Sequence, residues 1–398
     1  MRYNIFSKVM ESKLQKIFHK ILKQTIYGKI SVTYPNNDTY DYGINDDYKC
    51  DIKLNNFKFI SDVILKGNIG FAESYIYKNF YTSNLSKLIE FIILNQKTFL
   101  KVSNGNIFYR FFQKILHSQK NNTKKNSLKN ISHHYDLGNE FYQSWLDETM
   151  SYSSALFNKK SENLKEGQLN KYNRLIEIIK PTENNKILEI GCGWGKFTEY
   201  LAKNTNAHIT AVTISKNQYN DVCNLIQSEG LQDKVNIQLK DYRDINYKFN
   251  SIVSIEMFEA VGEKYWPLFF EKLRNNLKSE GKAALQIITI SNKLFENYRK
   301  RPDFIQRYIF PGGMLPSKKI LNKLIVDSGL TLKDEFNFAN SCAKTLELWN
   351  INFQKSWPEI SKKGFNEYFK RMWEYYFSYC EGGFRAGTID ISQFLISK

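Results

Sequence analysis

The sequence predicts an α/β protein in which a larger domain holds a doubly wound, mostly parallel sheet and a smaller α+β domain precedes it. A chain of 398 residues exceeds what a single hydrophobic core normally organises. After Pro181, apolar strand-like runs alternate with helical stretches, which is typical of a parallel sheet covered by helices on both faces. Residues 117–132 lose this apolar periodicity and become rich in Asn, Lys and Ser, which indicates a linker. We therefore expect one domain at 1–116 and another at 133–398.

The smaller domain is predicted to begin with a basic amphipathic helix. Residues 4–23 place apolar side chains at helical spacing, with lysines on the other faces. Such a helix either lies in a membrane interface or packs its apolar face on its own domain, and the pattern fits both. Residues 29–43 predict a hairpin that turns at 35–38, and residues 70–81 and 85–95 predict helices.

The larger domain is predicted to repeat a strand-then-helix unit. The strand segments begin at Asn185, Ala207, Val235, Phe249 and Gly281, and the helices between them end at Asn204, Glu229 and Lys278. Sheets of this kind bind ligands beyond the carboxyl ends of their strands. We therefore expect the functional residues in the turns that follow the strands.

Net charge indicates the kind of binding partner, and cysteine content indicates the redox state of the compartment. The net charge is +17, and residues 1–130 contribute +12 of it, from 21 Lys and Arg against 9 Asp and Glu. This excess predicts an anionic partner, either nucleic acid or a membrane surface. Five scattered cysteines without a C-x-x-C pair argue against a disulfide framework or a zinc site and fit a reducing cytoplasm, and we expect no metal. Residues 1–24 do not resemble a secretory signal.

A glycine-rich turn follows the first strand of the larger domain. Glu189 ends the strand, and Gly191, Gly193 and Gly195 alternate after it. Glycines let a backbone turn sharply and let a ligand approach without a Cβ in the way. Lys196 stands where the dinucleotide fingerprint needs Gly or Ala, so NAD is disfavoured. A G-x-G-x-G turn preceded by an acid is typical of the S-adenosylmethionine loop of Rossmann-like class I methyltransferases.

Several ordered blocks resemble one family of such enzymes. The blocks are GCGWG at 191–195, VTIS-x-x-Q at 212–218, HHYDLGNEFYQSWLDETMSYSSALF at 133–157, MFEAVG at 257–262, YIFPGGMLPS at 308–317 and YCEGGFRAG at 379–387. Together they resemble the cyclopropane fatty acid synthases and their mycolic acid relatives. The resemblance covers residues 133–387, and residues 70–81 look like part of that family's N-terminal domain. It implies methyl transfer from S-adenosylmethionine to the cis double bond of an acyl chain in a phospholipid, with ring closure through a carbocation.

The resemblance also implies catalytic residues. Glu259 matches the carboxylate that helps to hold a bicarbonate ion, which takes the proton. The other bicarbonate holders of the best-known members are replaced here by Ser154, Gln286 and Cys342, so bicarbonate is a possible cofactor only. His134 matches a family position that orients its block, and Tyr135 is one of the aromatic residues suited to shelter a cation, with Phe141, Tyr142, Trp145, Tyr152 and Phe157.

The same motif match implies the methyl-donor site. The residues implied are Gly191, Gly193, Tyr152 and Ser153 near the methionine end, Thr213 and Gln218 at the ribose, and Asp241, Tyr242 and Arg243 beside the adenine. Glu189, the acid before the glycine turn, is also implied in cofactor binding. Glu256, in the strand end IEMFEAVG, has no match in the family pattern. We expect it in a solvated turn or at the edge of the cofactor site.

Alternatives remain open at this point. The pattern of YSSA, IEMFEAVG and LQ-x-I-T-I resembles a second branch of the superfamily, for which a methyl-branched or methylene-bearing chain competes with the ring. A small-molecule methyltransferase is a further alternative. Nucleic acid is disfavoured because no base-flipping loop of the expected type occurs. We expect an enzyme peripherally associated with the cytoplasmic face of an anionic membrane, with a homodimer possible.

Overall fold

The protein is described by a computed structural model that covers residues 2–96 and 137–398, with side chains from residue 11 onward in the first range. The chain forms two compact units. The small unit holds the described part of 1–119 together with 300–309 and 357–388. The large unit holds the described part of 120–299 with 310–356 and 389–398. The predicted linker at 117–132 lies outside the described residues, so that boundary stays a prediction.

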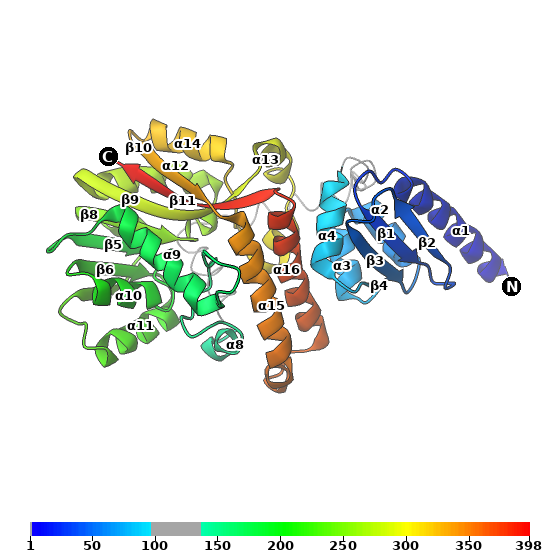
Figure 1. The fold of residues 1–398 in the computed structure, drawn as a ribbon, viewed down its shortest axis with the longest axis horizontal. Helices are drawn as coiled ribbons and strands as arrows, with labels where there is room; N and C mark the ends of the chain where they lie inside the picture. Colours follow the sequence, from blue (N-terminus) through cyan, green and yellow to red (C-terminus); the bar gives the residue numbers. More distant parts are fainter. Residues whose placement is uncertain (1, 97–136) are drawn as a thin grey trace. The chain divides into compact units, whose positions relative to one another are not determined.

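The small unit contains a four-stranded sheet in the order β2-β1-β3-β4. Its elements are α1 (Arg2–Leu22), β1 (Lys29–Thr33), β2 (Thr39–Gly43), β3 (Lys49–Leu54), α2 (Lys58–Lys66), α3 (Asn68–Ile76), β4 (Phe80–Tyr81) and α4 (Leu85–Leu94) (Figure 1). The predicted hairpin is confirmed, because β1 and β2 pair antiparallel with Lys29 opposite Gly43. The helix predicted at 70–81 ends earlier, since its last residues form β4.

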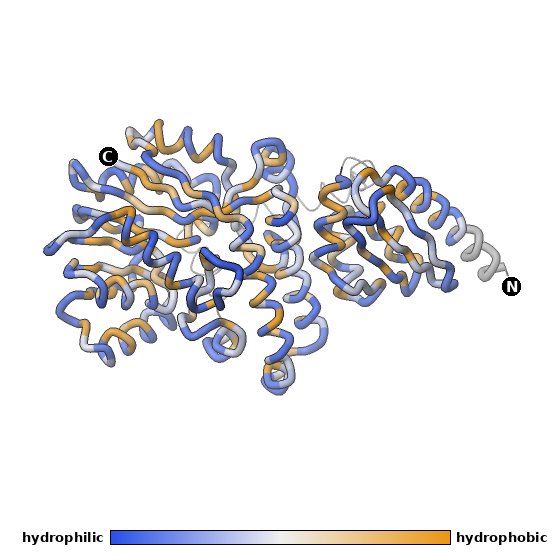
Figure 2. Tube along the Cα trace, viewed as in Figure 1, coloured by the Kyte–Doolittle hydropathy of each residue, from blue (hydrophilic) through white to orange (hydrophobic). Residues whose placement is uncertain are grey.

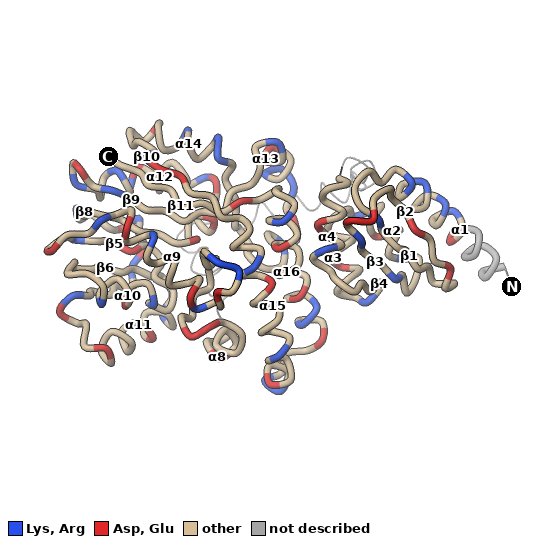
Figure 3. The backbone as a smooth tube through the Cα atoms, viewed as in Figure 1, with Lys and Arg blue, Asp and Glu red and all other residues tan. Residues whose placement is uncertain are grey.

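The first helix covers part of its apolar face within its own unit. Phe18 and Leu22 are buried, and the ring of Phe18 lies 5.8 Å from that of Phe59. Ile17 remains 47% exposed. Lysines recur along the described part of this helix, at Lys13, Lys16 and Lys20 (Figure 3). Within residues 11–22, two side chains of the apolar face, Phe18 and Leu22, therefore pack on the helix's own unit.

The large unit is built on a seven-stranded sheet in the order β10-β11-β9-β8-β5-β6-β7. The strands are β5 (Lys186–Ile190), β6 (His208–Thr213), β7 (Val235–Leu239), β8 (Phe249–Ile255), β9 (Leu277–Ile290), β10 (Thr331–Asn337) and β11 (Ile389–Ser397). β5 to β9 run parallel, whereas β11 is antiparallel to both β9 and β10. The expected doubly wound sheet is confirmed, with an antiparallel edge that the sequence pattern did not indicate.

Helices cover both faces of this sheet (Figure 1). The helices packed on it are α9 (Leu164–Ile179), α10 (Lys196–Asn204), α11 (Lys216–Ser228), α12 (Trp266–Asn276), α13 (Asn292–Tyr298) and α14 (Lys318–Asp327). The large unit also holds α8 (Asn139–Gln143) and most of α15 (Ala339–Lys362), whose last residues from 357 count with the small unit. The helix α16 (Glu367–Arg385) belongs to the small unit. Hydrophobic and hydrophilic residues alternate along these helices (Figure 2), as expected when one face of each is buried.

Two hydrophobic cores lie on opposite faces of the sheet. One joins α9, α10 and α11 to Ile187, and the other joins α12 and α14 to Leu188. Adjacent residues of β5 thus serve different cores, because successive side chains of a strand point to opposite faces. This packing fixes where β5, β6 and β8 end, and the turns after those strands carry the candidate site. Among residues 2–96 and 137–398, no helix is long and apolar enough to cross a bilayer.

Candidate active site

The glycine turn after β5 has the backbone geometry that the sequence predicted. Gly191, Gly193 and Gly195 adopt φ of 82°, 54° and 82°, in the left-handed region that favours glycine. A Cβ on Gly191 would lie 2.8 Å from Met257 Cγ, and one on Gly195 would lie 2.7 Å from Val222 Cγ1. A Cβ on Gly193 would meet nothing within 4 Å. Gly193 is therefore where the turn has room for a ligand, while its neighbours need glycine for packing.

Glu189 lies behind this turn. Its carboxyl is buried and accepts a hydrogen bond from the hydroxyl of Thr198, on the first turn of α10. Burial raises the pKa of Glu189 to about 7. The side chain thus links the end of β5 to the helix that follows the glycines.

The predicted pair at the end of β6 is brought together. Thr213 Oγ1 lies 3.0 Å from Gln218 Oε1, to which it donates, and accepts from the backbone N–H of Ser215 at 3.1 Å. Ser215 is also the N-cap of α11. Both Thr213 and Gln218 are buried. The hydroxyl and amide proposed for the ribose therefore lie at the same turn, beside the glycine turn that follows β5, where the Gly191 N–H donates to the Val212 carbonyl on β6.

The Asp241–Arg243 segment follows β7, as expected. Arg243 donates to both carboxylate oxygens of Asp241, at 2.8 and 2.6 Å. That pairing raises the pKa of the Arg243 guanidinium. The hydroxyl of Tyr242 is buried and has no hydrogen-bond partner within the described residues. Tyr242 thus keeps a buried polar atom without a partner among the described residues.

An aromatic cluster adjoins the glycine turn. The ring of Tyr152 lies 5.3 Å from that of Trp349 and 5.6 Å from that of Trp145. The ring of Tyr142 lies 5.4 Å from Tyr152 and 5.1 Å from Trp194, which belongs to the glycine turn itself. A cation held over these π faces would be stabilised.

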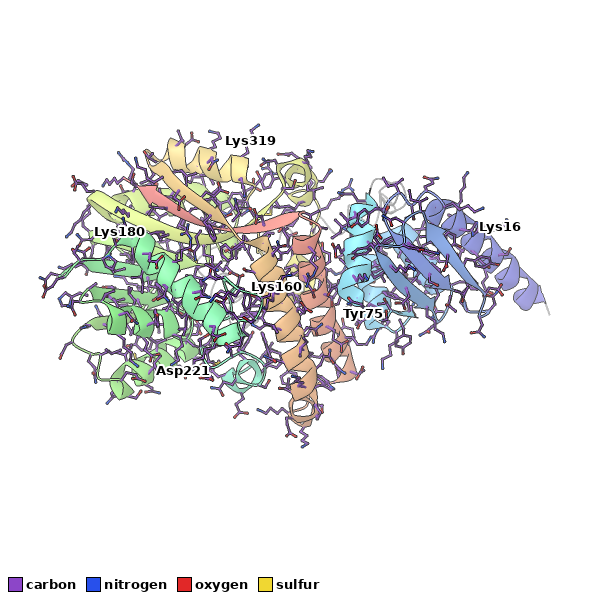
Figure 4. The ribbon with its side chains drawn as sticks, in the orientation of Figure 1. Lys16, Tyr75, Lys160, Lys180, Asp221 and Lys319 are labelled. Atoms are coloured by element: carbon purple, nitrogen blue, oxygen red, sulfur yellow. The ribbon has the colours of Figure 1, made fainter. Side chains whose placement is uncertain are left out.

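Hydrogen bonds hold Trp194, one member of this cluster, in place. Trp194 Nε1 donates to Asn139, whose amide in turn donates to Asp221 on α11. Asp221 is labelled in Figure 4. Phe157, predicted among the same aromatics, instead lies under Lys344, whose Nζ is 3.9 Å from the ring centroid. Trp349 was not found from the sequence, because it lies on α15, far along the chain from the other rings of the cluster and outside the matched blocks.

One carboxylate oxygen of Glu259 accepts a hydrogen bond, and the other has no partner among the described residues. It lies in a short 3-10 turn, Phe258–Ala260, just after β8. Its Oε1 accepts from the backbone N–H of Ile288 at 2.6 Å, and its Oε2 is buried without a hydrogen-bond partner in the described part of the chain. Burial, followed by the charge of Glu256, raises the pKa of Glu259 to about 8. At neutral pH this carboxyl is therefore mostly protonated.

Glu256 does not lie in a solvated turn, so that part of the expectation is wrong, whereas a place at the edge of the cofactor site stays a prediction. Its Oε1 accepts from the backbone N–H of Ser154 at 2.7 Å and from Gln286 Nε2 at 2.8 Å. Ser154 and Gln286 are both buried. Glu256 has φ of +49°, which disfavours a residue with a side chain by roughly 1–2 kcal/mol. The fold thus holds a carboxylate in a strained backbone position at the carboxyl end of a central strand.

Lys171 is a functional candidate that the sequence reasoning missed. It lies on α9, is fully buried, and donates to Ser153 Oγ at 2.7 Å and to Gln168 Oε1. Burial lowers the pKa of Lys171 to about 8, while Glu256 opposes that shift. A signal existed, because Lys171 shares the buried helical spacing of Leu164, Gln168 and Leu175.

The other predicted catalytic residues are Cys342, His134, Tyr135 and Ser154. Cys342 is buried on α15 and close enough to Lys171 to influence its pKa. His134 and Tyr135 lie outside the described residues, and their roles stay predictions. Ser154 presents its backbone N–H to the site, because its hydroxyl donates to the carbonyl of Ala155.

The two glutamates have different electrostatic surroundings. Hydrogen bonds from Gln286 and Ser154 and the charge of Lys171 favour the ionised form of Glu256, although burial still raises its pKa. No cation among the described residues lowers the pKa of Glu259, and the charge of Glu256 raises it. Such a pair can supply one proton acceptor and one neutral acid at the same pH.

The doubly wound sheet, the glycine turn with room at Gly193 and the polar residues after β6 and β7 define an S-adenosylmethionine-dependent methyltransferase. The family described as mycolic acid cyclopropane synthetase matches residues 122–394, and this chain belongs to it. A domain of unknown function matches residues 17–104.

Individual relatives agree with this assignment. The chain is 33% identical over 340 residues to a tuberculostearic acid methyltransferase of Mycobacterium tuberculosis, covering 83% of this chain and 79% of that protein. It is 34% identical over 364 residues to a cyclopropane-fatty-acyl-phospholipid synthase of Escherichia coli strain K12, covering 89% and 90%. A mycolic acid cyclopropane synthase solved with S-adenosylhomocysteine superposes with a TM-score of 0.64 at 28% identity, over 68% of this chain and 98% of that one.

Proposed function

We propose that this enzyme transfers a methyl group from S-adenosylmethionine to the cis double bond of an unsaturated fatty acyl chain in a phospholipid, and that the product is a cyclopropane ring. When bound, S-adenosylmethionine supplies an electrophilic methyl group. The observation that carries the proposal is the aromatic cluster around Tyr152, which adjoins the glycine turn through Trp194. π faces beside a methyl-donor turn suit a reaction in which positive charge develops on a hydrocarbon chain.

The acid pair supports the same reaction. Loss of a proton from the methylated chain needs an acceptor that remains ionised in a dry site. Glu256 and Glu259 lie at the carboxyl end of β8, and Met257 between them is the residue that a Cβ on Gly191 would touch. The acids are therefore one packed residue away from the glycine turn. A methyltransferase acting on a hydroxyl or amine of a small molecule does not need such a pair beside aromatic rings.

The first helix supports a membrane substrate. Lys13, Lys16 and Lys20 are exposed on α1, and the first 130 residues contribute most of the excess positive charge. Each lysine near an anionic leaflet contributes about 1 kcal/mol of attraction. We place the enzyme at the cytoplasmic face of an anionic membrane on this ground.

The direct test uses purified protein, methyl-labelled S-adenosylmethionine and vesicles that contain a monounsaturated phospholipid. Label in the released fatty acids, with a mass gain of CH2 and resistance to hydrogenation, is the expected result. The same mass gain with a reducible double bond would replace the ring by a methylene or methyl-branched chain. Tight binding of the donor without label in any lipid would favour the small-molecule alternative.

A further inference from the structure

The donors around Glu256 occupy the positions where the family resemblance expects a bicarbonate ion to be held. Ser154 and Gln286 stand at two of those positions. In this chain the N–H of Ser154 and the amide of Gln286 both donate to Glu256 Oε1, at 2.7 and 2.8 Å. These donors are thus already used by a carboxylate of the protein itself.

A second contact fixes the direction of the Gln286 amide. Gln286 lies on β9 opposite Gln393 on β11, and Gln393 Nε2 donates to Gln286 Oε1 at 3.0 Å. The amide oxygen of Gln286 therefore faces Gln393, and its nitrogen must face Glu256. Gln286 and Gln393 are fully buried, so this arrangement is set by the core rather than by solvent.

The charges of the site do not fit an additional anion. Glu256 and Glu259 are close enough that the charge of one raises the pKa of the other, and Lys171 is the buried cation that acts on Glu256. Bicarbonate would add a negative charge beside this pair and would compete with Glu256 for the same two donors. The residues present therefore do not fit a bound bicarbonate.

We propose that the carboxylate of Glu256 takes the place of bicarbonate in this enzyme and accepts the proton released during the reaction. The inference rests on the proposed function, since it names the proton acceptor of that reaction. Oε1 is held by Ser154 and Gln286, whereas Oε2 makes no hydrogen bond within the described residues and is left for the proton. In the step itself, a C–H bond of the added methyl breaks, its electron pair closes the ring on the cationic chain carbon, and the proton joins Oε2. Glu256 becomes a neutral carboxylic acid and returns its proton to solvent after product release.

Lys171 is a positioning residue in this scheme. It does not contact Glu256 directly but donates to Ser153 Oγ, next to Ser154 in the chain. Its charge favours the ionised form of Glu256. Ser153 and Ser154 are thereby fixed from one side by Lys171 and from the other by Glu256.

Two substitutions of Glu256 distinguish a role as proton acceptor from a purely structural role. Glu256→Gly removes the carboxylate, and relief of the backbone strain at φ of +49° offsets part of the cost of leaving the Ser154 and Gln286 donors without it, so the variant should still fold. Glu256→Gln keeps the side-chain volume and can still accept from Gln286, but cannot accept the proton. Lys180→Gly is the matched backbone control, because exposed Lys180 ends α9 with the same φ of +49° (Figure 4).

The experiment measures lipid methylation by the full-length enzyme in buffer freed of carbon dioxide, then with added bicarbonate. We expect the wild type to be fully active without bicarbonate and both Glu256 variants to lose about 100-fold or more in kcat, since general bases contribute about that much. Added bicarbonate should restore Glu256→Gly, where space is open, and not Glu256→Gln. Lys180→Gly should match the wild type.

The outcomes separate failure of the inference from failure of the proposed function. Wild-type turnover that depends on added bicarbonate, or full activity of Glu256→Gly without it, would overturn the inference while leaving lipid methylation intact. Absence of methylated lipid with the wild type under both conditions, despite tight binding of S-adenosylhomocysteine, would overturn the proposed function and the inference with it.

Discussion

At the scale of single residues, two glutamates three positions apart experience different surroundings. Glu256 accepts hydrogen bonds from two buried donors, whereas the second oxygen of Glu259 is buried without one among the described residues. The pKa of Glu259 in the folded protein is about 8, compared with 4.5 for an ordinary glutamate. The folded state therefore binds this proton more tightly than the unfolded chain does, and stability depends on pH through that difference.

Replacement of Glu259 by Gln should remove this dependence. The contribution of the Glu259 proton to stability is fully present below about pH 4.5 and is lost as pH rises through about 8. Between pH 5 and pH 8, the free energy of unfolding of the wild type should fall by a few kcal/mol relative to that of Glu259→Gln. Urea denaturation at several pH values measures the gap, with exposed Glu280→Gln as control. A gap that stays constant over this range would contradict the assigned environment of Glu259.

The sequence predicted part of this residue pattern. Glu259 was found because it lies in a recognisable motif, which follows the end of β8 at Ile255. Glu256 was misjudged because its partners come from β9 and from the segment before α9, far apart in the chain. A hydrogen bond between remote segments leaves no local periodicity in the sequence.

At the scale of elements, the glycine turn separates packing from ligand approach. Gly191 and Gly195 would clash with Met257 and Val222 if they carried a Cβ, whereas Gly193 would not clash within the protein. This difference lets a substitution at Gly193 probe ligand binding with little effect on packing.

Gly193→Ala should weaken the binding of S-adenosylhomocysteine by about tenfold or more, because the new methyl group enters space meant for the ligand. Its stability should fall by about 1 kcal/mol, the effect of a side chain at a left-handed position. Gly230→Ala is the matched control, since Gly230 also has positive φ and nothing within 4 Å of its added Cβ. Calorimetric titration of both variants measures the difference. Unchanged affinity in Gly193→Ala would show that the ligand does not approach this part of the turn.

Strong periodic elements were the ones that the sequence predicted well. The strands around the glycine turn and the helices that follow them match the structure to within a few residues. β10, β11 and the long helix α15 were not predicted, although β11 supplies Gln393 and α15 supplies Trp349. Their contribution to the site comes from pairing and packing with distant segments, which composition and spacing do not reveal.

At the scale of the whole molecule, the basic charge of the first helix predicts attraction to anionic membranes. Replacing Lys13, Lys16 and Lys20 by Gln should weaken binding to vesicles that contain anionic lipid by about tenfold or more at low salt. The effect should shrink as salt rises, because exposed charges are screened. Sedimentation with vesicles measures it, and Lys319, Lys323 and Lys333→Gln, all exposed in the large unit, form the matched control. Equal loss in both triple variants would indicate that only net charge matters.

The compact units join segments that are far apart in the chain. Residues 357–388, which include α16, belong to the small unit. In the chain, however, they follow β5 to β10, which are strands of the large unit. A hydrogen bond between Ser86 and Glu381 and one between Tyr75 and Glu374 hold this helix to the small unit's own elements. Linear boundaries drawn from composition cannot represent such an arrangement.

The measurement that tests the central claim most directly is the fate of the transferred methyl hydrogens. With S-adenosylmethionine carrying a CD3 methyl and monounsaturated phospholipid vesicles, the account predicts a saturated ring that retains two of the three deuterons, because one leaves to the protein's carboxylate. A product that retains all three would contradict it, since the proton would then have come from the chain. Lipids without deuterium would contradict methyl transfer to the acyl chain altogether.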